Sequence, residues 1–155
     1  MATRGFEFAY MIDRSGATPA IRDWEMAADA SGYKKGDLLV VNSNGRMAKG
    51  TASVKEVSAI CQETETSAVS NDDLLEVALV TPSQVWRCSM DATTTSAKKG
   101  YSKLIDVADE NTIDADDLTN GRMRLVDTDT DDEGNVLAYV IFGVCTFGSA
   151  GTAVL

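Results

Sequence analysis

Histidine is absent from the sequence, which removes the commonest catalytic side chain. Without imidazole there can be no Ser-His-Asp or Cys-His nucleophile arrangement and no histidine-ligated zinc. The sequence also lacks a glycine-rich phosphate loop and a dinucleotide-binding fingerprint. Carboxylate pairs such as Asp116-Asp117 fall in expected loops, so a hydrolase that uses carboxylates alone is the weakest hypothesis. We therefore predict that the protein is not an enzyme and has no cofactor.

Cysteines and long apolar runs are also scarce. Cys61, Cys88 and Cys145 are odd in number, lie far apart and form no CxxC pair, so we interpret them as buried free thiols. No apolar run approaches the roughly 18 residues of a membrane-spanning helix, and no basic-then-apolar leader follows Met1. We expect a protein that is made in the cytoplasm and has no membrane partner.

Basic residues are outnumbered, and the formal net charge is −10. Acidic side chains crowd residues 106–133, and such a field repels phosphate backbones, so we expect no nucleic-acid partner. Within the expected acidic turn Asp127 to Asn135, the segment Asp127 to Gly134 superficially resembles a calcium loop. Asp132 and Ala138 occupy the positions where an EF-hand needs glycine and glutamate. We predict a solvent-exposed hairpin turn there, with no metal site.

The sequence does contain many short strand patterns separated by turn signals. Leu38 to Val41 is an apolar run, and Asn44-Gly45 is a tight-turn signal, so residues 32–50 predict a β-hairpin. Further strand patterns occupy residues 21–26, 57–62, 74–81, 85–90, 101–107, 111–114, 122–126 and 136–147. The fold predicted is all-β, a small β-barrel or β-sandwich with an extended N-terminal arm. The side chains expected in its core are Leu39, Val41, Val77, Leu79, Trp86, Cys88, Leu125, Tyr139 and Ile141.

The first twenty residues differ from the rest, because aromatic and aliphatic side chains alternate with other residues from position 6 to position 12. Two interpretations stay open: a first strand of the barrel, or an arm whose aromatic face docks on a neighbouring protein. Residues 1–20 are thus an arm or first strand plus linker, residues 21–147 the β domain, and residues 148–155 a tail. We hypothesise that residues 2–12 leave the domain, with capsid or subunit contacts at Arg4, Phe6, Phe8, Tyr10, Ile12 and Arg14.

The order of these elements resembles a family of small β-rich capsid decoration, or cement, proteins of tailed bacteriophages. The resemblance covers about two-thirds of the chain, and it is one of pattern rather than of catalytic signature. It is carried by KKGDLLVVNSNGRMAKG at residues 34–50, VSAICQET at 57–64, LLEVALVTPSQVWRCSM at 74–90 and NGRMRLVDTDTDDEGNVLAYVIF at 120–142.

This resemblance implies a structural virion protein on the outer capsid surface. Such a protein stabilises the head by bridging subunits of the major capsid protein, and a homotrimer is the arrangement that the family favours. The alternative is a glycan-binding β-module, or adhesin, in which Trp24, Trp86 and Tyr101 could stack on sugars. By its alternation with Cys88 and Met90, however, Trp86 is expected in the core.

Overall fold

The structure is a computed structural model that describes residues 4–51, 56–91, 105–114 and 121–147. Within these ranges it contains strands and no helix, so the expected all-β fold is confirmed, and no described helix could cross a bilayer. The strands are β1 (Glu7–Met11), β2 (Ile21–Glu25), β3 (Leu38–Val41), β4 (Met47–Lys49), β5 (Ala59–Cys61), β6 (Leu74–Leu79), β7 (Gln84–Ser89), β8 (Asp106–Asp109), β9 (Thr112–Asp114), β10 (Met123–Thr130) and β11 (Val136–Phe142).

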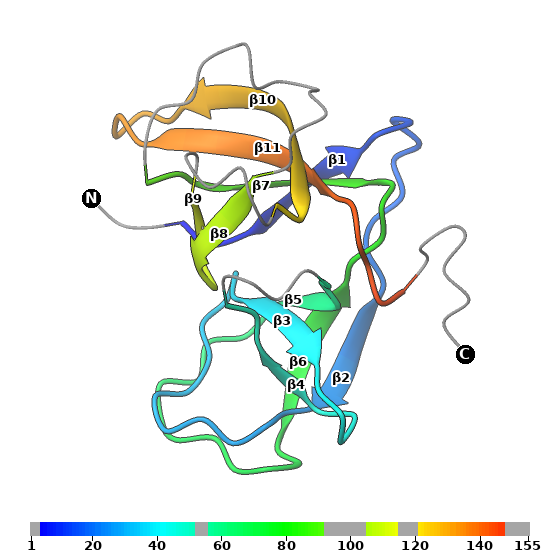
Figure 1. Cartoon of the computed structure of the whole chain (residues 1–155), viewed down its shortest axis with the longest axis vertical. Coiled ribbons are helices and arrows are strands. Elements are labelled where there is room, and N and C mark those ends of the chain that lie inside the picture. The colour runs from blue at the N-terminus through cyan, green and yellow to red at the C-terminus, as the bar shows by residue number, and fades with distance from the viewer. Residues whose placement is uncertain (1–3, 52–55, 92–104, 115–120, 148–155) are drawn as a thin grey trace.

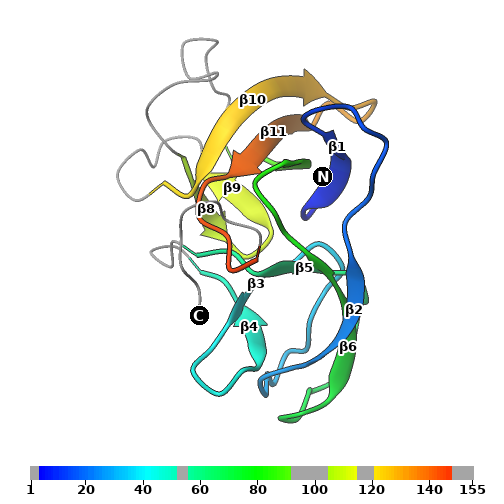
Figure 2. The same cartoon turned by 90° about the vertical axis from the view of Figure 1, so that its right-hand side faces the viewer.

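The strands form two larger antiparallel sheets and one small hairpin (Figure 1). One sheet has the order β1-β7-β11-β10, the second has the order β2-β6-β5-β3-β4, and β8 pairs with β9. Figure 2 shows the second sheet curving away beneath the first. The sheets are not closed into a barrel; they pack on each other through a shared core.

The central strands β3 and β5 of the five-stranded sheet are covered on both faces, because their side chains alternate between two clusters. Leu38 pairs with Ile60 and both contribute to the core shared with the four-stranded sheet. Leu39 pairs with Ala59 one step along, and both join a second cluster on the opposite face. That second cluster includes Tyr33, which comes from the connection that precedes β3. A sheet covered on both faces explains why the residues 38–41 are apolar without a break.

The expected core is confirmed at five positions and only partly at four. Leu39, Val77, Trp86, Cys88 and Leu125 are buried, and the three cysteines are buried free thiols as expected. On β11 the inward side chains are those at positions 138, 140 and 142, so the residues between them line the outer face. Val41 and Leu79 are partly covered at the rim of the second cluster. The half-buried members of the expected core are Val41, Leu79, Tyr139 and Ile141.

A buried ion pair that the sequence did not reveal fixes the β8–β9 hairpin to the four-stranded sheet. Arg122 donates from Nε to Oδ1 of Asp106 at 2.7 Å, and both side chains are fully buried. A second guanidinium nitrogen donates to the carbonyl of Thr51 at 2.7 Å. Burial lowers the pKa of Arg122 from its ordinary value, and the carboxylate of Asp106 opposes that shift. The pair therefore holds a buried cation by charge and by hydrogen bonding together.

We predict that Leu39→Ala destabilises the fold by about 2–5 kcal/mol, because it leaves a cavity in a fully buried site. The matched variant is Leu74→Ala, at a side chain that is 60% exposed, and it should change stability by less than about 0.5 kcal/mol. Urea unfolding of both variants measures the difference. Equal effects of the two substitutions would contradict the assignment of the second cluster.

We also predict that Arg122→Leu destabilises the protein by about 3–5 kcal/mol, because it leaves the Asp106 carboxylate buried without its cation. The double variant Arg122→Leu/Asp106→Leu should lose less stability than the single one, since no unpaired charge then remains. A double-mutant cycle from urea unfolding measures the coupling between the two residues. Additive losses would show that the two side chains act independently.

Candidate functional site

The N-terminal segment with the predicted contact residues lies inside the fold. β1 pairs with β7, and the N–H of Phe6 donates to the carbonyl of Gly36 at 2.8 Å. Phe6 packs in the shared core with its ring centroid 5.4 Å from that of Phe142. In the structure this segment is a strand of the four-stranded sheet, which agrees with the first of the two interpretations. The expectation that it leaves the domain is wrong for residues 6–11, because the strand pairs with β7 and because Phe6 and Phe8 pack against the shared core.

A β-bulge in β1 places its aromatic residues on two different faces. Phe8 is opposite Trp86 and Tyr10 is opposite Val85, so Ala9 is an extra residue in the strand. Such an insertion reverses the alternation of the residues that follow it. Phe8 consequently contacts the core residue Trp86, with ring centroids 5.6 Å apart. Tyr10 instead lies on the outer face of the sheet, where its ring is 6.4 Å from that of Tyr139.

A second bulge, in β10, does the same at the opposite edge of the sheet. The register shifts between Leu125, which is opposite Val140, and Asp127, which is opposite Tyr139. Without the extra residue, Asp127 would share the inward face of Leu125. The bulge turns its carboxylate outward instead, next to the tyrosines. Both edge strands of this sheet thus deliver polar or aromatic groups to one outer surface.

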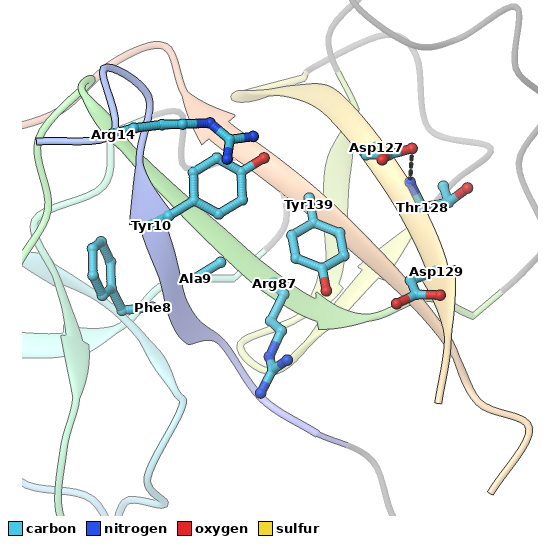
Figure 3. Close-up of a pocket in the computed structure, with 9 residues that line it drawn as sticks. All are labelled: Phe8, Ala9, Tyr10, Arg14, Arg87, Asp127, Thr128, Asp129 and Tyr139. Atoms are coloured by element: carbon cyan, nitrogen blue, oxygen red, sulfur yellow. Dashed lines mark hydrogen bonds between the residues drawn. The ribbon is translucent and has the colours of Figure 1, made fainter. Parts of the chain in front are cut away.

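These residues line an open groove of about 650 Å³ on the outer face of the four-stranded sheet (Figure 3). A smaller hollow of about 340 Å³ shares part of this lining and continues along the connection after β1, at residues 16–18. We call the larger hollow the tyrosine groove. Its lining residues are Phe8, Ala9, Tyr10, Arg14, Arg87, Asp127, Thr128, Asp129 and Tyr139.

Two tyrosine rings form the floor of the tyrosine groove, and cations stand beside them. The two ring planes are 29° apart, and Figure 3 shows the rings side by side on the sheet. Arg14 has a φ of 56°, which is uncommon for a residue with a side chain, and its guanidinium lies 5.6 Å from the centre of the Tyr10 ring. Arg87 is held by Glu7 through Nε at 3.0 Å and Nη2 at 2.9 Å. That hydrogen bond raises the pKa of Arg87, with a smaller contribution from Tyr139.

Carboxylates complete the opposite side of the groove. Asp127 accepts a hydrogen bond from the N–H of Thr128 at 2.9 Å, and Asp129 accepts one from the N–H of Thr130 at 2.8 Å. These bonds hold both carboxylates close to their own strand. The groove therefore presents aromatic surface between fixed positive and fixed negative groups. Such a lining suits the binding of a mixed polar and apolar partner surface.

The remaining predicted contact residues lie outside the tyrosine groove. Ile12 is 48% exposed at the end of β1. Arg4 forms an ion pair with Asp131 at 3.4 Å in the turn between β10 and β11. Asp131 also accepts hydrogen bonds from the N–H of Glu133 and from the side-chain amide of Asn135. The acidic turn is thus shorter than expected, spanning residues 131–135, and the side chain of Asp131 is 8% exposed rather than solvated.

Sequence reasoning missed six of the nine lining residues, and all of these except Ala9 come from distant strands. Arg87 alternates with the buried Trp86, so its outward direction was implied, but its neighbours across the sheet were not. Tyr139 was expected in the core because β11 is apolar along its whole length. Asp129 was assigned to a turn, whereas it lies within β10. Among the described residues, no group of three or more Cys, Asp or Glu side chains is placed to hold a metal ion.

We predict that Asp131 makes stability fall in acid. Hydrogen bonding from the Asn135 side chain is the main cause that lowers the pKa of Asp131, and burial opposes it. A lowered folded-state pKa adds stability above the unfolded value of about 3.9 and loses it as the pH falls through the folded value. Urea midpoints measured from pH 6 downward should fall less in Asp131→Asn and in Asn135→Ala than in the unmodified protein. Identical slopes in all three proteins would contradict this role.

No protein-family model, curated protein or solved structure matches the chain. The tyrosine groove carries two phenols, two guanidinium groups and two carboxylates along one surface.

Proposed function

We propose that the protein is a structural virion protein that binds the outer surface of a bacteriophage capsid. It stabilises the head by bridging subunits of the major capsid protein, and it acts as a homotrimer. The resemblance of residues 34–50, 57–64, 74–90 and 120–142 to decoration proteins supports this assignment. The compact all-β fold, with its N-terminal strand packed in the core, is compatible with a protein that must survive on the outside of a particle.

The tyrosine groove is the observation that carries the proposal. Tyrosine and arginine are the residues most enriched where protein interfaces derive their binding energy, since they combine large contact area with directed hydrogen bonds. Tyr10 and Tyr139 supply that area, while Arg14 and Arg87 supply the donors. Two of these four, Tyr10 and Arg14, belong to the contact residues predicted from the sequence. A capsid subunit that inserts an apolar side chain between acidic and basic groups would match this lining.

The size of the groove favours a multivalent arrangement. Stable interfaces bury about 1,200–2,000 Å² in total, which is more than one open groove of this kind can cover. A trimer presents three grooves to neighbouring capsid subunits. Once one groove has bound, the others bind at a high effective concentration, so weak single contacts give tight attachment. The shell is then stabilised by mass action, because the ligand binds only the assembled state.

We predict that Tyr10→Ala and Arg14→Glu each weaken binding to expanded, undecorated heads by about tenfold or more, as hot-spot residues do. Lys35→Glu is the matched control for the change of charge, since Lys35 is exposed and lies away from the groove. Co-sedimentation with heads measures the affinity, and size-exclusion chromatography measures the oligomeric state. A protein that ignores such heads, or groove variants that bind as well as the control, would overturn the proposal.

Glycan binding is the second candidate function, and the two flat tyrosine rings favour it. The tryptophans named from the sequence are poor candidates, because Trp86 is 1% exposed and the indole N–H of Trp24 is bonded to the carbonyl of Gly45 at 2.9 Å. Tyr101 lies outside the described residues. A glycan-array signal that Tyr10→Ala removes, in a protein that does not bind heads, would establish this function instead.

A further inference from the structure

The outermost strand of the five-stranded sheet, β2, has an open edge. It pairs with β6 alone, in a regular antiparallel register from Ile21 to Glu25 without a bulge. Figures 1 and 2 both show β2 at the margin of the molecule. All of its residues except the half-buried Trp24 are exposed. The open edge therefore runs along the strand, except at the carbonyl of Ile21, which accepts a hydrogen bond from the Arg22 guanidinium at 3.3 Å.

Hydrogen bonds at the two ends of β2 show which backbone groups face the open side. The carbonyl of Ala20 accepts from β6 at 2.9 Å, and the N–H of Met26 donates to the carbonyl of Asp73 at 2.9 Å. Because bonding alternates along an antiparallel strand, the backbone groups of residues 21, 23 and 25 point away from β6. Among the described residues, no backbone–backbone hydrogen bond outside the strand pairs involves the N–H or C=O group of Asp23 or Glu25.

The other edges of the two larger sheets are blunted, as edges of natural sheets usually are. β1 carries a bulge, and Gly36 accepts the N–H of the residue before the strand. β10 carries a bulge as well, and Ile105 pairs with its first residue. At β4, Ala27 donates to the carbonyl of the first residue. β2 thus differs from these three edges in having no bulge and no backbone partner on its outer side along Ile21–Glu25; the residue that follows it, Met26, bridges Met47 of β4.

The side chains along this edge indicate the partner's charge. The side chains of Ile21, Asp23 and Glu25 share one face of β2. On that face Asp23 lies opposite Glu76 of β6. Two copies of β2 that paired antiparallel with each other would bring these carboxylates together, which is destabilising. A strand that carries basic residues opposite Asp23 and Glu25, and an apolar residue opposite Ile21, would match the face. The exposed Leu74, opposite Glu25, adds apolar area.

We propose that the β2 edge is an acceptor site for an extended basic segment of a partner protein, which adds to the sheet as a sixth strand. Main-chain hydrogen bonds to Asp23 and Glu25 provide the affinity, and alternate lysine or arginine side chains provide the specificity. The site lies on a different sheet from the tyrosine groove and does not depend on the function proposed for it.

A labelled peptide, Thr-Lys-Thr-Lys-Thr-Val-Thr, tests the site on the full-length protein. Aligned antiparallel, its lysines face Glu25 and Asp23 and its valine faces Ile21. The matched control peptide has glutamate in place of both lysines. Fluorescence anisotropy at about 20 mM salt, where screening is weak, should show binding of the lysine peptide alone. Hydrogen exchange followed by NMR should show new protection of the amides of Asp23 and Glu25.

Two variants separate strand addition from simple charge attraction. Asp23→Pro removes one outward N–H and is compatible with an edge strand, so it should weaken binding of the lysine peptide by about tenfold or more. Asp23→Asn is its control, since it removes the same charge and keeps that N–H, and it should bind better than Asp23→Pro. The double variant Asp23→Lys/Glu25→Lys, which keeps every backbone group, should prefer the glutamate peptide. Binding of neither peptide, unchanged exchange at Asp23 and Glu25, or an unchanged peptide preference in the double variant would overturn the proposal.

Discussion

Strand alternation is the constraint on which the outer surface of this protein depends. Every second side chain of a strand in the four-stranded sheet faces the shared core, so a strand can show polar groups only at the positions between them. One extra residue in β1 and one in β10 reverse that alternation partway along each strand. The first half of each strand can therefore fill the core with Phe8 or Leu125, while the second half supplies Tyr10 or Asp127 to the tyrosine groove.

The same two strands link stability and recognition. β1 is needed by the core, since Phe6 packs against Phe142 and Phe8 against Trp86. Burial of these aromatic side chains within their own sheet stabilises the folded protein, whereas an arm would leave them exposed to water until a partner bound. The groove is in turn rigid because it is built on paired strands, and because Arg87 is held by Glu7 across the β1–β7 pair. Groups fixed in this way lose little entropy on binding.

The sequence predicted what local patterns determine and failed where distant residues decide. The all-β fold, the hairpin at Asn44-Gly45 and the buried thiols followed from alternation, turn residues and cysteine spacing. The pairing of Arg122 with Asp106 joins residues from separate strands and leaves no local signal. The bulges are equally hidden, because Phe6, Phe8 and Tyr10 keep a perfect period of two in the sequence although the backbone does not. The lining residues from β1 and the turn after it were therefore largely predictable, and those from the other strands were not.

An open sheet edge is a hazard for a protein that must not aggregate, and its chemistry here limits that hazard. Asp23 and Glu25 on β2, beside Glu76 of β6, repel a second copy that approaches edge to edge. The net charge of −10 adds a longer-range repulsion between molecules. Neither effect opposes a basic strand, for which both become attraction. On the proposed function of this edge, it discriminates by charge: it repels a second copy of itself and attracts a basic strand, whereas bulges or backbone partners blunt the other three edges.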